Sequence, residues 1–159
     1  MISTSVFITK GEYAITDDPD ATISTLLGSC VACCLWDWIA GVGGMNHMLI
    51  TTGGKRDARC NRAGVQAMEL LVHDLLSYGA KRSRLQAKVF GGAQMVRGLS
   101  GIGAANCTFK LDYLQRENIP CDTQSLGGAM ARQVQFWPVP GAARQRRSGK
   151  QALSLNQKS

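Results

Sequence analysis

The sequence is poor in aromatic residues and proline, and it contains no long uncharged hydrophobic run. Three Trp, three Tyr, four Phe and four Pro occur among its 159 residues. The most apolar stretch, residues 25–40, is interrupted by Gly28 and Asp37 and is shorter than the roughly 20 apolar residues that span a membrane. No basic segment followed by an apolar one opens the chain, so we expect no secretory signal, no membrane insertion and a cytoplasmic location.

The length and the apolar content predict one folded domain. Hydrophobic residues make up 45% of the chain and charged residues 18%, which is too apolar for a disordered protein. A chain of about 150 residues buries roughly 70% of its unfolded surface, enough for a sizeable core. Strand-like and helix-like segments alternate and the first third is rich in strands, so we predict a mixed α/β domain over residues 1–141.

Acidic residues are scarce. Eleven Asp and Glu face 18 Lys and Arg, which gives a net charge of +7. Five of the basic residues and no acidic one fall within residues 142–159, a segment that is also rich in Gln and Ser. This composition predicts a mobile basic tail over residues 142–159. Such a tail can attract an acidic partner, a nucleic acid or an anionic lipid, but a solvated tail without a specific target fits it better, so we expect no specific nucleic-acid partner.

Turn residues and hydrophobic periodicity divide the domain into short elements. We predict strands over residues 6–9, 13–16, 21–27, 42–50, 85–90 and 134–137. A helix should begin after Asn61 and end at Gly79, and a second helix should span residues 106–117. Residues 31–36 fit either a buried strand or a buried helical turn, which periodicity alone does not distinguish.

Cys30 differs from the other five cysteines because it follows a predicted strand and a tight Gly28-Ser29 turn. Such a turn exposes the sulfur, and neighbouring backbone N–H groups can point at a developing oxyanion. Cys30 is therefore a candidate nucleophile, although a Gly-Ser-Cys turn into a core segment is also a common structural element. Most of the other cysteines are expected to be small core residues with reduced thiols.

A cysteine nucleophile needs a base, and the chain offers only His47 and His73. His73 falls on the polar face of its helix, in register with Glu69, as is typical of a solvated side chain. His47 lies in a strand among apolar residues, which suits either a core histidine or a site residue. A third group should orient the imidazole, and Ser24 and Thr25 lie just before the cysteine turn, on opposite faces of their strand.

Two other uses of the cysteines stay open. Cys30 and Cys33 have the spacing of a redox pair, although the intervening Val-Ala lacks the turn of thioredoxin-like motifs. A zinc site is the second alternative, with His47 and Cys60 joining these two cysteines. The Gly-Gly pair at residues 91–92 lacks the rest of a nucleotide-binding loop.

Six short motifs follow one another along most of the chain. They are Gly11-Glu12-Tyr13-Ala14, Leu27-Gly28-Ser29-Cys30-Val31-Ala32, Gly43-Gly44-Met45-Asn46-His47-Met48-Leu49, Phe90-Gly91-Gly92-Ala93-Gln94-Met95, Ile102-Gly103 with Asn106, and Leu126-Gly127-Gly128. In this order they resemble the CheD family of chemoreceptor glutamine deamidases, from about residue 11 to residue 136. One motif would be a weak signal, but the ordered set is specific.

The resemblance implies a cysteine hydrolase of bacterial chemotaxis, which converts glutamines of methyl-accepting chemotaxis receptors to glutamate through a thioester and without a metal or organic cofactor. It assigns the nucleophile to Cys30 and the base to His47, and the family's threonine, six residues before the cysteine, falls on Ser24. It also implies a layered α/β fold in which two packed mixed sheets are flanked by helices. A CheC-type phosphatase is the other expected partner, and a mainly regulatory binding protein is the alternative function.

Ser24 departs from the family's threonine. Serine keeps a hydroxyl for the imidazole but lacks the stiff β-branched side chain. We predict that Ser24 serves as the third catalytic residue, with Thr25 as a less suitable substitute because it points to the other face.

Two further departures concern docking. Ala105 replaces an arginine that often precedes Asn106 in the family, and a proline-containing and basic segment replaces the family's last strand. Because the expected substrate is a protein surface, we predict a shallow groove with Met45, Met48 and the loop 51–59 as its walls.

Overall fold

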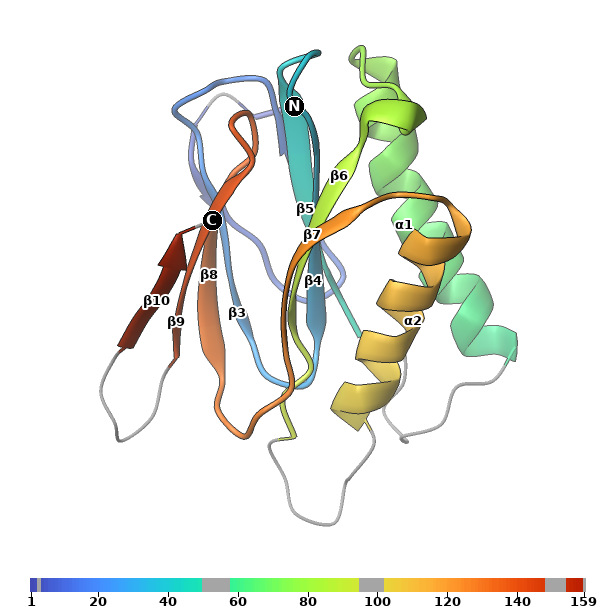
Figure 1. The fold of residues 1–159 in the computed structure, drawn as a ribbon, viewed down its shortest axis with the longest axis vertical. Coiled ribbons are helices and arrows are strands. Elements are labelled where there is room, and N and C mark those ends of the chain that lie inside the picture. Colours follow the sequence, from blue (N-terminus) through green and yellow to red (C-terminus); the bar gives the residue numbers. More distant parts are fainter. Residues whose placement is uncertain (3, 50–57, 95–101, 148–153, 159) are drawn as a thin grey trace.

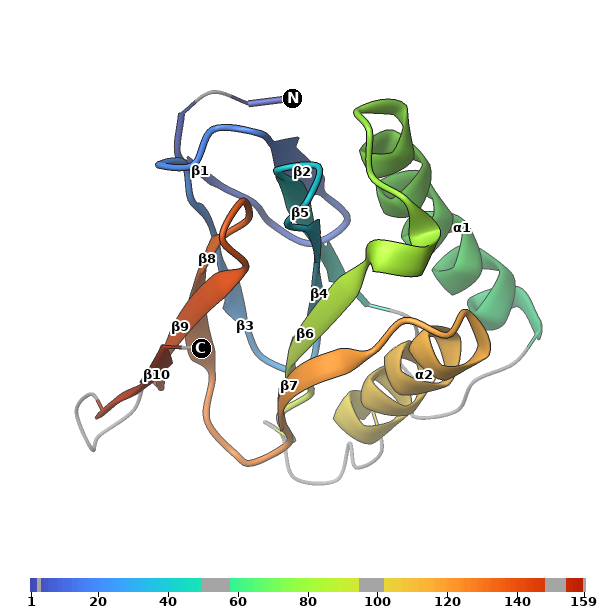
Figure 2. The ribbon, with the colours of Figure 1, turned by 45° about the horizontal axis from the view of Figure 1, so that its top comes forward.

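The fold consists of two five-stranded sheets and two helices, arranged as three layers (Figure 1). The computed structural model describes residues 1–159 except residues 3, 50–57, 95–101, 148–153 and 159. One sheet lies between the other sheet and the helices (Figures 1 and 2). This arrangement confirms the predicted layered α/β fold of mixed sheets, with both helices on the same side.

The central sheet has the strand order β2-β5-β4-β6-β7. Its strands are β2 (Tyr13–Thr16), β4 (Val31–Asp37), β5 (Val42–Met48), β6 (Gln86–Gly91) and β7 (Cys121–Leu126). Strand β4 pairs antiparallel with both β5 and β6, and β7 runs parallel to β6. Every residue of β4 and β5 is buried, as expected for strands covered on both faces.

The outer sheet has the strand order β1-β3-β8-β9-β10. Its strands are β1 (Val6–Phe7), β3 (Ile23–Leu27), β8 (Arg132–Trp137), β9 (Ala142–Arg147) and β10 (Ser154–Lys158). Strand β3 pairs parallel with β1 and antiparallel with β8. Within the described residues, no helix covers the far face of this sheet (Figure 2).

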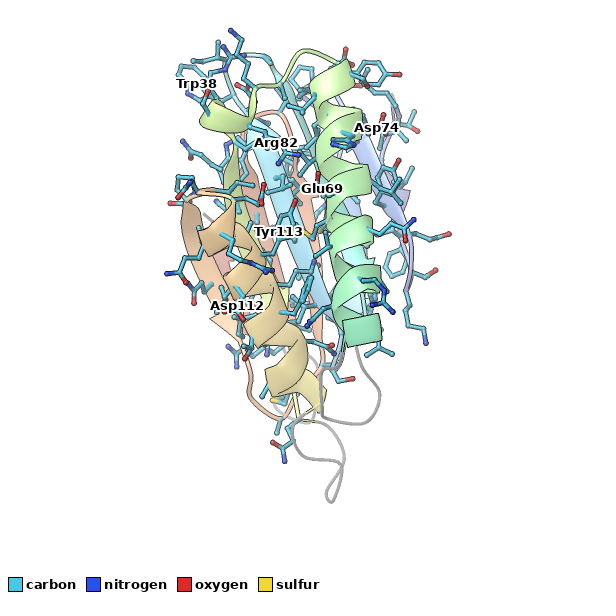
Figure 3. All side chains as sticks on the ribbon, turned by 90° about the vertical axis from the view of Figure 1, so that its right-hand side faces the viewer. Trp38, Glu69, Asp74, Arg82, Asp112 and Tyr113 are labelled. Atoms are coloured by element: carbon cyan, nitrogen blue, oxygen red, sulfur yellow. The ribbon has the colours of Figure 1, made fainter. Side chains whose placement is uncertain are left out.

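Helices α1 (Ala58–Ser77) and α2 (Ile102–Arg116) pack on the central sheet, and a 3₁₀ turn, η1 (Arg82–Arg84), precedes β6. Figure 3 shows the two helices side by side, with Glu69 of α1 facing Tyr113 of α2. Arg82 Nη2 donates to Glu69 Oε1 at 2.7 Å, and the Tyr113 hydroxyl donates to the same carboxylate. None of the helices in the described part of the chain is long and apolar enough to cross a bilayer.

The side chains of β4 alternate between two separate apolar cores. Cys33 and Leu35 pack under the helices, whereas Ala32 and Cys34 pack between the two sheets. This alternation shows that residues 31–36 form a buried strand and not a helical turn. It also places the two adjacent cysteines in different cores, where both are buried free thiols.

Several predicted boundaries differ from the structure, at strands as well as helices, and β7 was not predicted. Helix α1 begins at Ala58 instead of after Asn61, and α2 begins at Ile102 instead of residue 106. The prediction of a mobile tail from residue 142 is wrong for Ala142–Arg147, which form β9. Along β9 the inward side chains, Ala143 and Gln145, are buried, so the strand joins the core despite its arginines. Ser154–Lys158 form β10, which pairs with β9, so the prediction is wrong there too, and residues 148–153 and 159 lie outside the described residues.

Candidate functional site

Cys30 lies in the turn between β3 of the outer sheet and β4 of the central sheet. Three hydrogen bonds fasten this turn from outside. The backbone N–H of Gly92 donates to Cys30 O at 2.8 Å, and that of Ala93 donates to Gly28 O at 2.9 Å. The side-chain Nδ2 of Asn106, on α2, donates to Ser29 O at 2.9 Å. The half-buried cysteine therefore sits on a turn held by both β6 and α2.

The glycines after β6 make this fastening possible. Gly91 has a φ of +118°, and a Cβ atom at this position would lie 2.2 Å from Cys30 O. A side chain is therefore excluded both by the backbone conformation and by the close approach of the cysteine turn. The Gly-Gly pair, which the sequence places in one of the six motifs and not in a nucleotide-binding loop, is the place where the cysteine turn packs.

His47 faces the same layer as Cys30. Residue 47 is paired with Ala32 in the β4–β5 ladder, two residues after Cys30. Ala32 and Cys30 both contact the apolar core between the sheets. The imidazole crosses that layer to Thr25 of the outer sheet. Cys30 directly precedes β4, so the sequence-predicted cysteine and histidine come to the same layer from two paired strands.

The residue that orients His47 is Thr25. Its Oγ1 lies 2.7 Å from His47 Nδ1, and both side chains are buried. The prediction of Ser24 for this contact is wrong, because Ser24 has the opposite orientation on β3 and is only half-buried. The inward positions of β3 are Ile23, Thr25 and Leu27, so a single hydroxyl stands between two apolar side chains.

A backbone carbonyl fixes the protonation of this histidine. The Thr25 hydroxyl donates its one hydrogen to Ile8 O at 2.7 Å. Its oxygen must then accept from His47, which puts the imidazole proton on Nδ1. The lone pair on Nε2 is thereby left to take a proton, as a general base requires.

The environment keeps His47 uncharged. Burial lowers its pKa to about 4, the charges of Lys110 and Lys10 lower it as well, and Glu12 opposes them. Burial also raises the pKa of the Cys30 thiol, against the charges of Lys10 and Lys110. Near neutral pH the resting site therefore holds a thiol beside a neutral imidazole.

The redox use of the cysteines does not fit this geometry, and the zinc alternative includes Cys60, whose side chain lies outside the described residues. Cys33 packs under the helices, on the other face of β4 from the layer that Cys30 contacts, so the two do not form a redox pair. Within the described residues, no group of three or more His, Cys, Asp and Glu side chains is arranged to hold a metal ion. His73 is exposed and lies 3.2 Å from Glu69, as predicted for a surface histidine.

The residues predicted to form the walls of one groove lie in different places in the structure. Met45 is buried between the sheets and lines no groove. Met48 lines a hollow of about 360 Å³, together with Lys10 and Leu49. Residues 51–57 of the predicted loop lie outside the described residues, and Ala58 already belongs to α1. A larger cavity of about 730 Å³ between α1 and α2 does not include the cysteine or the histidine.

Comparison with known proteins agrees with the resemblance. A family model described as CheD chemotactic sensory transduction matches residues 48–147, beginning directly after His47. A protein of Caulobacter vibrioides named probable chemoreceptor glutamine deamidase CheD is 49% identical over 143 residues, which cover 89% of this chain and 76% of the relative. A protein of the same name from Agrobacterium fabrum is 49% identical over 141 residues, covering 88% and 78%.

Solved structures resemble the chain only distantly. The Neisseria meningitidis protein NMB0706, of family DUF152, aligns with a TM-score of 0.47 at 8% identity, over 79% of this chain and 64% of its own. The sequence matches show the family and confirm the resemblance drawn from the motifs. This chain belongs to the CheD family.

Proposed function

We propose that the protein is a chemoreceptor glutamine deamidase, which hydrolyses the side-chain amide of receptor glutamines to glutamate and ammonia. The observation that carries the proposal is the hydrogen bond from His47 Nδ1 to Thr25, which leaves the other ring nitrogen as a base on the layer that Cys30 contacts. The names of the Caulobacter and Agrobacterium relatives support the same substrate and reaction.

The first half of the reaction forms a thioester. His47 Nε2 takes the proton of Cys30, and the sulfur attacks the δ-carbonyl carbon of the glutamine, whose π electrons move to the oxygen. Backbone N–H groups near Ser29 and Cys30 would hold this oxyanion, a contact worth roughly 3 kcal/mol per donor. When the carbonyl reforms, the C–N bond breaks, and the imidazolium gives its proton to the nitrogen, which leaves as ammonia.

The second half regenerates the thiol. Neutral His47 removes a proton from water, and the hydroxide attacks the thioester carbonyl. The C–S bond then breaks, glutamate leaves, and the thiolate recovers its proton from the imidazolium. Thr25 serves both halves by accepting from Nδ1–H, which keeps Nε2 directed at the reacting groups. Glutamyl methyl esters would pass through the same thioester, so ester hydrolysis is an expected side activity.

The setting of the reaction is proposed to be the cytoplasm, with the receptor as the main partner. The described cysteines are free thiols, which suits a reducing compartment. A CheC-type phosphatase is a second proposed partner. Regulation of that partner without catalysis is the alternative function, and it would need no neutral base beside a cysteine.

Mass spectrometry of a receptor cytoplasmic fragment tests the proposal. We expect glutamine-to-glutamate conversion with the wild-type protein and none with Cys30→Ala or His47→Ala. His73→Ala is the matched control, because this exposed histidine lies outside the site, and it should convert the fragment like wild type.

Two results would contradict the proposal. Conversion that persists in Cys30→Ala would remove the nucleophile assignment. A folded wild-type protein that converts no receptor fragment, but binds a CheC-type phosphatase, would favour the regulatory alternative.

A further inference from the structure

In the part of the chain that the structure describes, Lys110 is a buried cation without an acidic partner. This α2 side chain is fully buried under the central sheet. Its Nζ donates to Asn46 Oδ1 at 2.6 Å. Among the described residues, no carboxylate oxygen lies within 4 Å of this ammonium group. Burial lowers the pKa of Lys110 to about 8, so the group still carries its charge near neutral pH.

The partner of Lys110 is a residue of the active strand pair. Asn46 precedes His47 on β5 and points to the helix side of the sheet, while His47 points to the sheet–sheet layer. The Asn46 amide is used on both sides: its Oδ1 accepts from the Cys33 N–H at 3.2 Å, and its Nδ2 donates to Met68 Sδ at 3.3 Å. The ammonium is thus held in place directly behind the strand that carries the base.

An isolated buried cation is unfavourable, because it loses hydration without gaining a counter-charge. A methionine or leucine would fill the same place under the sheet at no such cost. Asn46 does not need the ammonium group as a partner, because its amide already bonds to Cys33 and Met68. The positive charge itself therefore calls for a role.

The charged surroundings of His47 narrow that role. The charged groups that act on it are Lys110 from α2 and, from the segment before β2, Lys10 and Glu12. Lys10 and Glu12 are exposed, so solvent and salt screen their charges. Lys110 is the buried member of the set, and its field is screened least.

We propose that Lys110 is a positioning residue whose buried ammonium, held by Asn46, keeps His47 uncharged and so available as a base. This inference rests on the proposed function for its purpose, but the electrostatic effect is a property of the folded protein alone. A positive charge behind the base also makes the imidazolium formed during the reaction a better acid, which favours protonation of the departing ammonia.

NMR titration of the two histidines tests the inference without any substrate. His73 is exposed and serves as an internal reference, and a His73→Gln variant assigns the signals. Lys110→Met keeps the aliphatic stem and removes the charge, and Lys110→Gln also keeps a donor for Asn46. We expect the His47 midpoint to rise by roughly one pH unit in both variants, since the removed charge is buried on the other side of the strand that carries His47 and is little screened by solvent. The His73 midpoint should stay unchanged.

Lys10→Met removes an equal charge from an exposed position. Its effect on His47 should be smaller and should vanish in 1 M salt, whereas the Lys110 effect should persist. An unchanged His47 midpoint in Lys110→Met and Lys110→Gln would overturn the inference. A shift in Met but not in Gln would also overturn it, because a hydrogen bond would then be responsible instead of the charge.

Activity separates this inference from the proposed function. With a deaminating wild type, the acid limb of the pH profile should move upward by the same unit in both Lys110 variants. A shifted His47 midpoint in a protein that deaminates no receptor would uphold the role of Lys110 and reject the deamidase.

Discussion

The two ends of the β4–β5 strand pair each bury a polar side chain, and they use it in opposite ways. At the hairpin end, Asp37 is fully buried, and its carboxylate accepts from the N–H groups of Ile39, Ala40 and Lys81 and from Arg84 Nε. At the other end, His47 has one ring nitrogen bonded, and Nε2 has no partner within the described residues. A buried polar group with every hydrogen bond made is structural, whereas one with a single group left open is available for chemistry.

The pKa directions follow the same division. Burial raises the pKa of Asp37, but hydrogen bonds from Lys81, Ala40 and Arg84 outweigh it, and the result lies below the ordinary value. For His47 only the charge of Glu12 opposes the effect of burial, so the pKa stays low and the imidazole is neutral near neutral pH. The strand pair therefore keeps a charged Asp37 at its hairpin end, where the role is structural. It keeps a neutral His47 at the other end, where the reaction is proposed.

Removing the satisfied carboxylate should have the largest effect on stability. Asp37→Ala leaves three backbone N–H groups and Arg84 without their acceptor, and we expect a loss of about 4 kcal/mol in the free energy of unfolding, measured by urea titration. Asp20→Ala, at an exposed position, should change stability by less than about 0.5 kcal/mol. The alkylation rate of Cys30 in the folded Asp37 variant should stay near wild type, and a large fall would show that the two ends are coupled.

Lowering the pH should destabilise the folded protein because His47 is held neutral. The unfolded state takes up a proton near pH 6.5, while folded His47 does so only near pH 4. Stability is therefore present above pH 6.5 and is lost as the pH falls to 4, by up to about 3 kcal/mol. Thermal melts of wild type and His47→Gln should converge over this range, whereas His73→Gln should follow wild type. A parallel course for wild type and His47→Gln would contradict the assignment of a depressed pKa.

The third prediction separates the two hydroxyls of β3. Thr25→Val removes the acceptor of Nδ1–H without changing the shape, and kcat for deamidation should fall about 100-fold, within the range for a disturbed general base. Thr25→Ser should retain most of the rate, because it keeps the hydroxyl. Ser24→Ala should stay within about twofold of wild type, since this side chain is on the other face. The reverse ranking of Ser24→Ala and Thr25→Val would restore the original assignment to Ser24.

The sequence predicted Cys30, His47 and Ser24 for the site, but the hydroxyl that contacts His47 lies one position later, on Thr25. Side chains alternate along a strand, so a shift of one residue changes the face completely. Which face of β3 is inward depends on its pairing with β8, about 110 residues away, where Thr25 lies opposite Val134. The signal that was present is the inward set Ile23, Thr25 and Leu27, in which the hydroxyl is flanked by apolar residues.

Other features were missed because their cause is not local. Strand β9 has the composition of a tail, and only its pairing with β8 shows that Ala143 and Gln145 face the core. Lys110 looks like a surface lysine on a short helix, and its contact with Asn46 joins residues 64 positions apart. Turns and periodicity identified the elements, whereas tertiary packing decided which polar side chains were buried.

The hydrogen bond between Thr25 and His47 joins one sheet to the other, so the chemistry depends on how the two layers are aligned. If the outer sheet slid by one residue pair, about 7 Å along a strand, both sheets and their ladders could survive intact. The turn that carries Cys30 joins β3 to β4 and would be displaced as well, and the base would have lost its orienting partner. The rate of deamidation would then report how the two sheets are aligned with each other, a property that secondary-structure measurements do not detect.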